Sequence, residues 1–235
     1  MAVAAALSDL CQALSGHLVS PGRLERRQSF LPTGLAALDD VLGGGWPLGT
    51  LSELAGDGLP RATVARRSSG RTSVLYASVA AAQRRGEAVA LVDVGGSLDA
   101  PAAQRAGIEL SRLLWVRAND RQHLSAADLL VTAGGFGLVA VDLADCPLRV
   151  PAATWLRLAR GAERQSTVVL LSAPWRLAGS FAAAAVVVSG RDVCFEGSGD
   201  GPRLFLGFDA SAVVARSRGH VDASLAAAPR LSLSL

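Results

Sequence analysis

A short stretch in the first third of the chain has the residue types of a phosphate-binding loop. It reads Ser-Ser-Gly-Arg-Thr-Ser, and an apolar run with helical spacing follows it. In such loops, backbone N–H groups at a helix N-terminus hold the phosphates, a lysine reaches the β- and γ-phosphates, and a Ser or Thr hydroxyl binds Mg²⁺. The stretch therefore predicts a nucleotide site formed by Ser68, Ser69, Gly70, Arg71, Thr72 and Ser73, in which Thr72 takes the hydroxyl position.

This loop departs from a working phosphate loop at two landmarks. Arg71 stands where the lysine is required, and the first glycine of the pattern falls at Ala65. Arginine is a wide planar fork and lysine a compact ammonium, so the exchange is not conservative in a tight cradle. All 23 basic residues of the chain are arginine, so no lysine elsewhere can replace the missing one. We therefore expect a degenerate site that binds ATP and Mg²⁺ weakly at most.

Two aspartates end apolar segments that read as strands. Asp142 follows Leu-Val-Ala-Val, where a carboxylate either orients Mg²⁺ through water or caps the next turn. We include Asp142 in the degenerate site as a descended Mg²⁺ position. Asp93 ends an equivalent segment, and two residues later Gly95 stands where a general base for hydrolysis would be expected. The sequence therefore predicts no catalytic residue and little turnover.

Other chemistry finds little support in the composition. The three cysteines and three histidines are widely scattered, which predicts neither a metal site nor a nucleophile–base pair. The net charge of +3 does not by itself indicate nucleic-acid binding. Arg61, Arg66, Arg67 and Arg71 share one acid-free stretch, which is either a solvated basic loop or a patch facing phosphate or DNA.

Strands and helices must alternate to position these residues. We expect strands at 50–54, 88–94, 113–117, 138–143 and 167–172, and helices at 33–42, 72–85, 124–133 and 152–164, with a further helix after Pro101. Continuous apolar strands separated by helices indicate a mostly parallel sheet covered on both faces. Four short strands at 185–189, 193–196, 204–208 and 212–216 should extend that sheet in antiparallel fashion. The carboxyl ends of the parallel strands would then bring the phosphate loop, Asp93 and Asp142 together.

The chain divides into a core and two extensions. We expect an N-terminal helix and linker over residues 1–29, a core over 30–216 and a tail over 217–235. The apolar alternation that ends the tail either pairs with a partner's sheet edge, pairs within the chain or frays. No apolar run reaches the ~18 residues of a membrane span, and no basic region precedes the first apolar stretch, so we expect a soluble cytoplasmic protein.

Motifs along the first third resemble the RecA-type ATPase core. They are Leu-Pro-Thr-Gly-Leu at 31–35, Leu-Gly-Gly-Gly-Trp-Pro at 42–47 and the loop at 68–72. The resemblance implies a RecA-like P-loop NTPase fold, an α/β fold whose mostly parallel central sheet is flanked by helices. The glutamate that RecA carries after its strand-ending aspartate is replaced by Gly95. The segment after Leu171 lacks the glutamine that couples ATP to DNA, so strand exchange is not expected.

Later segments are similar to the ImuA family of RecA-like proteins. They lie at 114–117, 133–139, 156–164 and 177–181. The resemblance implies an accessory role in damage-induced translesion DNA synthesis within the SOS response. The implied partners are an inactive Y-family polymerase homologue of the ImuB type, an error-prone DnaE-type polymerase and, as a further candidate, RecA. It also implies a cytoplasmic protein that joins the nucleoid on DNA damage. From the residues themselves we expect weak, salt-sensitive DNA binding at most and no membrane contact.

Two other functions stay open on the sequence. The first is an ATP-dependent DNA repair or recombination ATPase in which Arg71 acts for lysine. The second is an SOS cell-division inhibitor, whose relatives share a reduced RecA-like fold; the nearly complete series of strands and helices argues against it.

Overall fold

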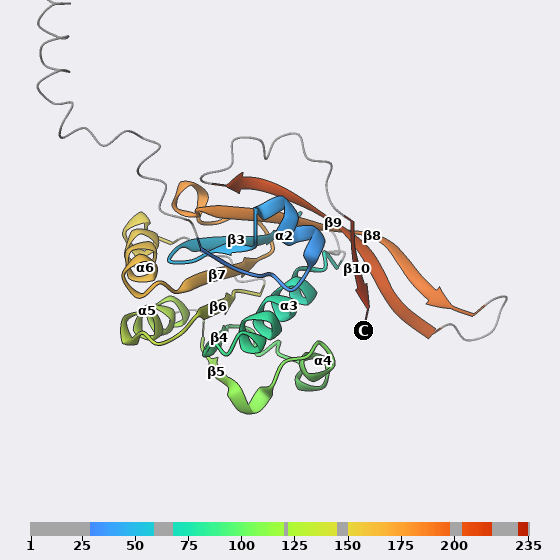
Figure 1. Ribbon diagram of the computed structural model, residues 1–235, viewed down its shortest axis with the longest axis horizontal. Helices are drawn as coiled ribbons and strands as arrows, with labels where there is room; N and C mark the ends of the chain where they lie inside the picture. The colour runs from blue at the N-terminus through green and yellow to red at the C-terminus, as the bar shows by residue number, and fades with distance from the viewer. Residues whose placement is uncertain are drawn as a thin grey trace, which may run out of the picture.

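The computed structural model describes residues 29–58, 68–119, 122–144, 150–197, 204–217 and 230–234. Its main element is an eight-stranded sheet of order β10-β9-β8-β3-β7-β6-β4-β5, in which β8, β3, β7, β6, β4 and β5 run parallel. The strands are β3 (Leu51–Gly56), β4 (Val89–Asp93), β5 (Leu113–Arg117), β6 (Leu138–Asp142), β7 (Val168–Ala173), β8 (Ala184–Glu196), β9 (Leu204–Ser217) and β10 (Arg230–Ser234). The antiparallel strands β9 and β10 extend one edge. The predicted mostly parallel α/β fold with antiparallel C-terminal strands is confirmed (Figure 1).

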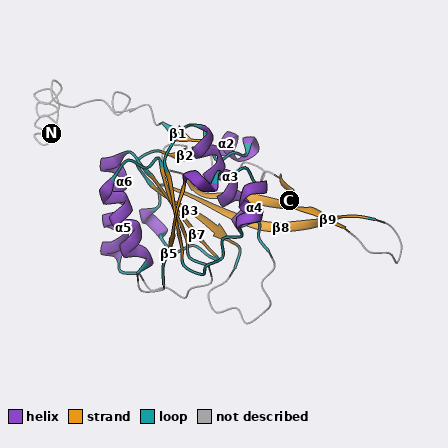
Figure 2. Cartoon of the chain, turned by 90° about the horizontal axis from the view of Figure 1, so that it is seen from below, coloured by secondary structure: helices purple, strands orange, loops and turns teal. Residues whose placement is uncertain are grey.

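Helices cover both faces of the parallel part of the sheet (Figure 2). They are α2 (Ala36–Leu42), α3 (Arg71–Arg84), α4 (Ala100–Arg105), α5 (His123–Ala133) and α6 (Ala152–Gln165), with short 3₁₀ turns η2 (Leu110–Arg112) and η3 (Gly179–Phe181). Leu75 of α3 belongs to a buried cluster on one face, and Trp155 of α6 to a second cluster on the other. Alternate residues of each strand supply the two clusters, which explains why the strands read as continuous apolar runs.

A two-stranded sheet, β1 (Phe30–Leu31) with β2 (Trp46–Pro47), precedes the main one. The helix expected at 33–42 starts later than predicted, because α2 begins at Ala36 and its N-cap is Leu35. The Thr33 hydroxyl instead contacts the backbone of Leu35, and the Thr33 N–H donates to Asp39. The predicted end of this helix is confirmed, since Gly43 takes the left-handed conformation with φ 75°.

The C-terminal strands differ from the four short ones that the sequence suggested. The two segments at 185–189 and 193–196 are one strand, β8, and those at 204–208 and 212–216 are one strand, β9. The register of the β8–β9 pair shifts around Gly190 and Cys194. The break in the apolar pattern therefore corresponds to a bulge within β8, and not to a gap between two strands. The pair continues beyond the body of the molecule as a projecting arm (Figure 1).

The strand β10 belongs to the region predicted as a tail. It pairs antiparallel with β9, from Arg230 opposite Ser211 to Ser234 opposite Gly207. Of the readings left open for the terminal alternation, pairing within the chain is the one observed. The predicted N-terminal helix and the residues 59–67 ahead of the phosphate loop lie outside the described residues. Among the helices that the structure describes, none has both the length and the apolar character needed to cross a bilayer.

Candidate functional site

The predicted site residues meet at the carboxyl ends of β3, β4, β6 and β7. The helix α3 begins there at Arg71, and its N-cap Gly70 has φ 87°, a left-handed conformation that glycine adopts without strain. Asp93 and Asp142 are paired neighbours at the ends of β4 and β6. Thr72 lies exposed in the first turn of α3, and Ser73 is half-buried beside it.

Arg71 turns back onto the sheet, away from solvent. Its Nη1 donates to Asp142 Oδ1 at 2.8 Å and to Ser172 Oγ at 2.7 Å. The side chains of Arg71 and Asp142 are 14% and 7% exposed, so the ion pair is largely shielded from water. The guanidinium thus supplies beside Asp142 the positive charge that a bound Mg²⁺ would bring in a nucleotide site. It also ties the start of α3 to the ends of β6 and β7.

The remaining acceptor positions of Asp142 face donors of the protein itself. The Ala144 N–H donates to Oδ1 at 3.2 Å, and the Ser97 hydroxyl lies 3.3 Å from Oδ2. Together with Arg71, these groups surround a carboxylate that is nearly buried. Asp142 is therefore held as a structural acceptor by three parts of the chain.

Asp93 is satisfied in the same manner. The backbone N–H groups of Ser97 and Leu98 donate to its two oxygens at 3.0 and 3.1 Å, and Trp115 Nε1 donates to Oδ2 at 3.1 Å. Its exposed fraction is 1%. The Arg117 guanidinium stacks over the Trp115 ring at 5.5 Å from the centroid, which covers this side of the cluster.

A buried phenol completes the polar cluster. Tyr76 of α3 accepts a hydrogen bond from the Asp99 N–H at 3.3 Å. Burial raises the pKa of Tyr76 above its ordinary value, the Asp99 backbone hydrogen bond lowers it, and the nearby carboxylates of Asp142, Asp99 and Asp93 raise it further. The phenol is therefore neutral at physiological pH and cannot serve as a base there.

The turn before α3 is pressed against β8. A Cβ added at Gly190 would lie 2.2 Å from the Ser68 carbonyl oxygen, so β8 approaches this turn as closely as its glycine allows. Ser69 Oγ accepts from the Arg71 N–H at 3.3 Å, which occupies one of the N–H groups that would face a phosphate. The turn is thus packed against β8, and one of its N–H groups is bonded to its own side chain.

The position expected to carry a general base is filled by Gly95. A Cβ there would lie 3.0 Å from Ala144 Cβ, so a side chain fits only with a small shift. In the described part of the chain, no group of three or more His, Cys, Asp or Glu residues is placed to hold a metal ion. With Arg71 on Asp142 and no glutamate at residue 95, the side chains as placed do not fit a catalytic Mg²⁺–ATP site.

Sequence reasoning missed Glu53, which lies fully buried in β3. Its Oε1 accepts hydrogen bonds from the N–H groups of Leu177 and Ala178, the latter at 2.9 Å. Arg176 Nε lies 3.5 Å from Oε2. Glu53 therefore fixes the loop after β7. The signal was present: Glu53 is the charged residue in an otherwise uncharged strand.

Comparisons with known proteins point to one family. A family model, the RecA N-terminal domain, matches residues 3–153. The RecA protein of Enterococcus hirae is 34% identical over 122 residues, which cover 51% of this chain and 33% of that protein. The RecA protein of Streptomyces ambofaciens is 37% identical over 114 residues, covering 48% of this chain and 28% of that protein. The chain thus matches about a third of the length of these relatives.

Proposed function

Because this chain belongs to the RecA family, we propose that it acts as a RecA-like accessory protein of damage-induced translesion DNA synthesis. It works through protein contacts and not through nucleotide turnover. The observation that carries this proposal is the shielded Arg71–Asp142 ion pair, with Ser172 as a second acceptor for Arg71. An ATPase of this fold needs these positions free for phosphate and Mg²⁺.

The resemblance of residues 114–117, 133–139, 156–164 and 177–181 to the ImuA family supports the finer assignment. The partners that follow from it are an inactive Y-family polymerase homologue and an error-prone DnaE-type polymerase, with RecA as a third candidate. The place of action is the cytoplasm, at the nucleoid after DNA damage. Contacts with DNA are weak, because the net charge is only +3. They are salt-sensitive, because contacts between arginine and phosphate weaken as salt rises.

A DNA-dependent repair ATPase is the second candidate, favoured by the 34% identity to RecA across half of the chain. Calorimetric titration with Mg²⁺–ATP and hydrolysis assays with single-stranded DNA separate the two. We expect neither saturable binding in the micromolar range nor turnover for the natural protein. Micromolar affinity of the natural protein for Mg²⁺–ATP, or DNA-stimulated hydrolysis, would establish the ATPase instead.

A genetic test addresses the cellular role directly. Deleting the gene should reduce damage-induced mutagenesis, and re-expression of the natural protein should restore it. Thr72→Ala removes the hydroxyl expected to hold Mg²⁺ while leaving an exposed helical position well suited to alanine. We expect Thr72→Ala to restore mutagenesis fully; failure of this variant, at normal protein level, would contradict a role without nucleotide.

A further inference from the structure

The arm formed by β8 and β9 has an open edge. The strand β8 pairs with β3 only through Val188, opposite Gly56, whereas its pairing with β9 continues to Glu196 opposite Leu204. Residues 191–196 of β8 thus have no strand partner on the β3 side within the described part of the chain. Figure 1 shows the arm projecting from the body, with β10 lying along β9.

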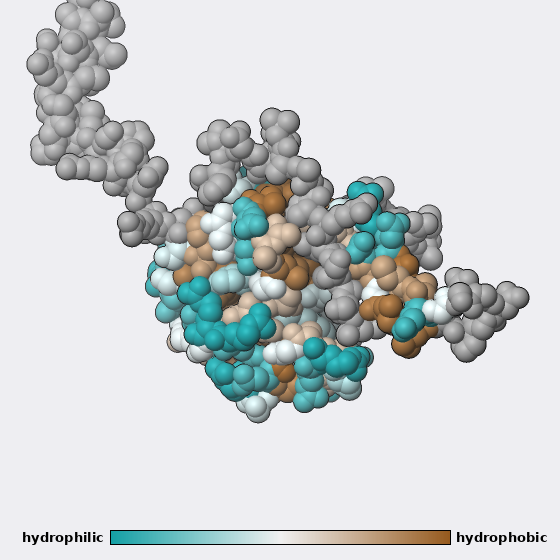
Figure 3. Space-filling view, turned by 45° about the vertical axis from the view of Figure 1, so that its right-hand side comes forward, coloured by the Kyte–Doolittle hydropathy of each residue, from teal (hydrophilic) through white to brown (hydrophobic). Residues whose placement is uncertain are grey.

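One face of the arm is apolar and continues from the core. Phe208 packs against the first buried cluster, and Val193 stands opposite it in the register. Phe195 and Phe205 follow, their rings in edge-to-face contact at a centroid distance of 5.7 Å. Val193 is 55% and Phe195 50% exposed. In Figure 3 hydrophobic residues gather along the arm.

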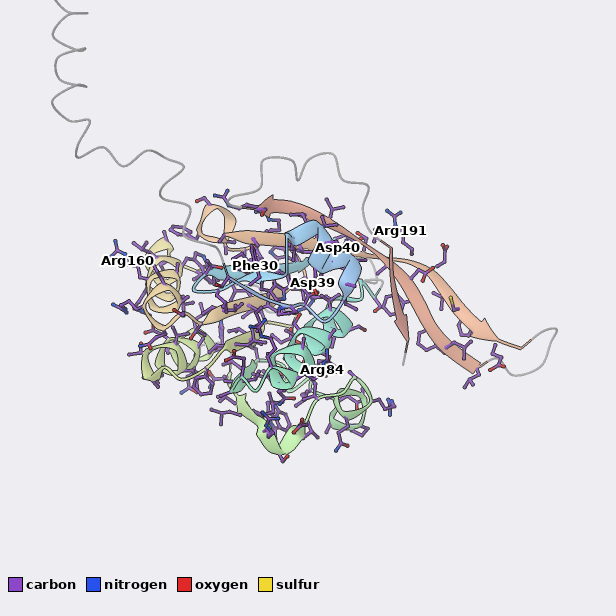
Figure 4. All side chains as sticks on the ribbon, in the orientation of Figure 1. Phe30, Asp39, Asp40, Arg84, Arg160 and Arg191 are labelled. Carbon is purple, nitrogen blue, oxygen red and sulfur yellow. The ribbon has the colours of Figure 1, made fainter. Side chains whose placement is uncertain are left out.

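The open edge also has a charge. Asp192 and Glu196 are exposed along it, whereas Arg191 donates from Nε to Ser211 Oγ on β9 at 3.0 Å. Arg191 marks the point at which the arm leaves the body (Figure 4). Along the edge strand, Asp192 and Glu196 thus flank the segment that contains the apolar Val193 and Phe195. The basic residue Arg191 is directed toward β9.

These features argue against a second copy of the chain as the occupant. The exposed parts of Val193, Phe195 and Phe205 amount to on the order of 300 Å², well below the roughly 800 Å² per partner of a stable complex. Antiparallel pairing of two β8 edges centred on Cys194 would place Asp192 opposite Glu196 of the other copy, and like charges opposite each other destabilise such a pair. A short segment that adds one strand needs less area, because main-chain hydrogen bonds supply much of its affinity.

We propose that the open edge of β8, residues 191–196, binds an extended segment of a partner protein in which apolar residues alternate with arginine or lysine. The apolar residues of that segment lie beside Val193 and Phe195, and its basic residues face Asp192 and Glu196. The β9 side of the same sheet already pairs with a strand in which leucines alternate with polar residues, since β10 reads Arg-Leu-Ser-Leu-Ser. This surface goes beyond the proposed function, which names partners but no binding site for them.

The test uses the full chain and a fluorescent synthetic peptide of about eight residues, alternating valine or leucine with arginine. A peptide of the same composition with its apolar residues grouped together serves as the matched ligand control. We expect saturable binding of the alternating peptide by fluorescence anisotropy and slower amide hydrogen exchange at 191–196. Val193→Thr with Phe195→Thr should weaken it at least about tenfold, since threonine keeps the strand but removes the apolar contacts.

Leu129→Ser is the matched protein control, because Leu129 on α5 is 71% exposed and far from the arm in the fold. It should leave binding unchanged. Glu196→Arg should weaken the arginine peptide and favour a peptide in which glutamate replaces arginine. Equal binding of the grouped peptide, no loss in the threonine variant, or a dimer abolished by that variant would overturn the proposal. Since the assay contains no nucleotide, DNA or polymerase, its outcome is independent of the tests of the proposed function.

Discussion

The phosphate-loop end of the sheet and the β8–β9 arm differ in which side chains they expose to solvent. At the loop end, Asp93 and Asp142 are buried, Arg71 is partly buried, and all three are hydrogen-bonded to neighbouring side chains or to the backbone. On the arm, Val193 and Phe195 remain half exposed. Nucleotide chemistry needs polar groups open to a ligand, and protein docking needs apolar groups open to a partner. The contrast supports the proposal that this RecA-family protein binds its partner through the arm.

The strongest way to break this comparison is to remove Arg71. Arg71→Ala leaves Asp142 as a buried carboxylate without its counter-charge, which typically destabilises a protein by about 3–5 kcal/mol. Urea unfolding followed by tryptophan fluorescence measures the loss. Arg157→Ala is the matched control: its ion pair with Asp128 on α5 is more exposed and should contribute less than about 1 kcal/mol.

Equal and small losses for Arg71→Ala and Arg157→Ala would mean that the buried pair has no structural role. The loop end would then be an open site, and the contrast with the arm would disappear.

Removing Glu53 tests the same end of the sheet with a smaller expected effect. Glu53→Ala leaves the N–H groups of Leu177 and Ala178 without their acceptor, at a cost of about 2 kcal/mol. Glu53→Gln keeps an acceptor oxygen and should cost less. Urea unfolding gives the free energy, and hydrogen exchange at Leu177 and Ala178 reports whether the loop after β7 is released. Unchanged exchange in Glu53→Ala would show that the loop is held by other contacts.

Sequence patterns were sufficient for the fold class and for the edge of the sheet at which the predicted residues meet. Apolar strands ending in Asp93 and Asp142, and a helix expected over 72–85, locate the carboxyl edge of a parallel sheet because strand ends of this type meet there. The ion pair between Arg71 and Asp142 could not be predicted from the sequence, since the residues are 71 positions apart and the contact depends on the conformation of the long Arg71 side chain.

The arm was predicted incompletely for a local reason. The sequence predicted gaps between short strands at 190–192 and 209–211, yet both gaps lie inside β8 and β9, and Gly190 serves the close approach of the Ser68 carbonyl. Glycine in a strand signals either a turn or a close contact, and only the tertiary neighbours distinguish the two. The buried role of Glu53 was missed for a related reason, because its partners come from the loop after β7.

Changing the arm should have the smallest effect on stability. Val193→Thr is expected to alter the free energy of unfolding by less than about 0.5 kcal/mol. Phe195→Thr should cost about 0.5–1.5 kcal/mol through its lost ring contact with Phe205. Val186→Thr in the inner half of β8 is the matched control. Val186 is fully buried, so a hydroxyl there would be shielded from water, and this variant should lose more free energy of unfolding than either arm variant. If the arm variants cost as much as Val186→Thr in urea unfolding, Val193 and Phe195 would be part of the folded core and unavailable to a partner.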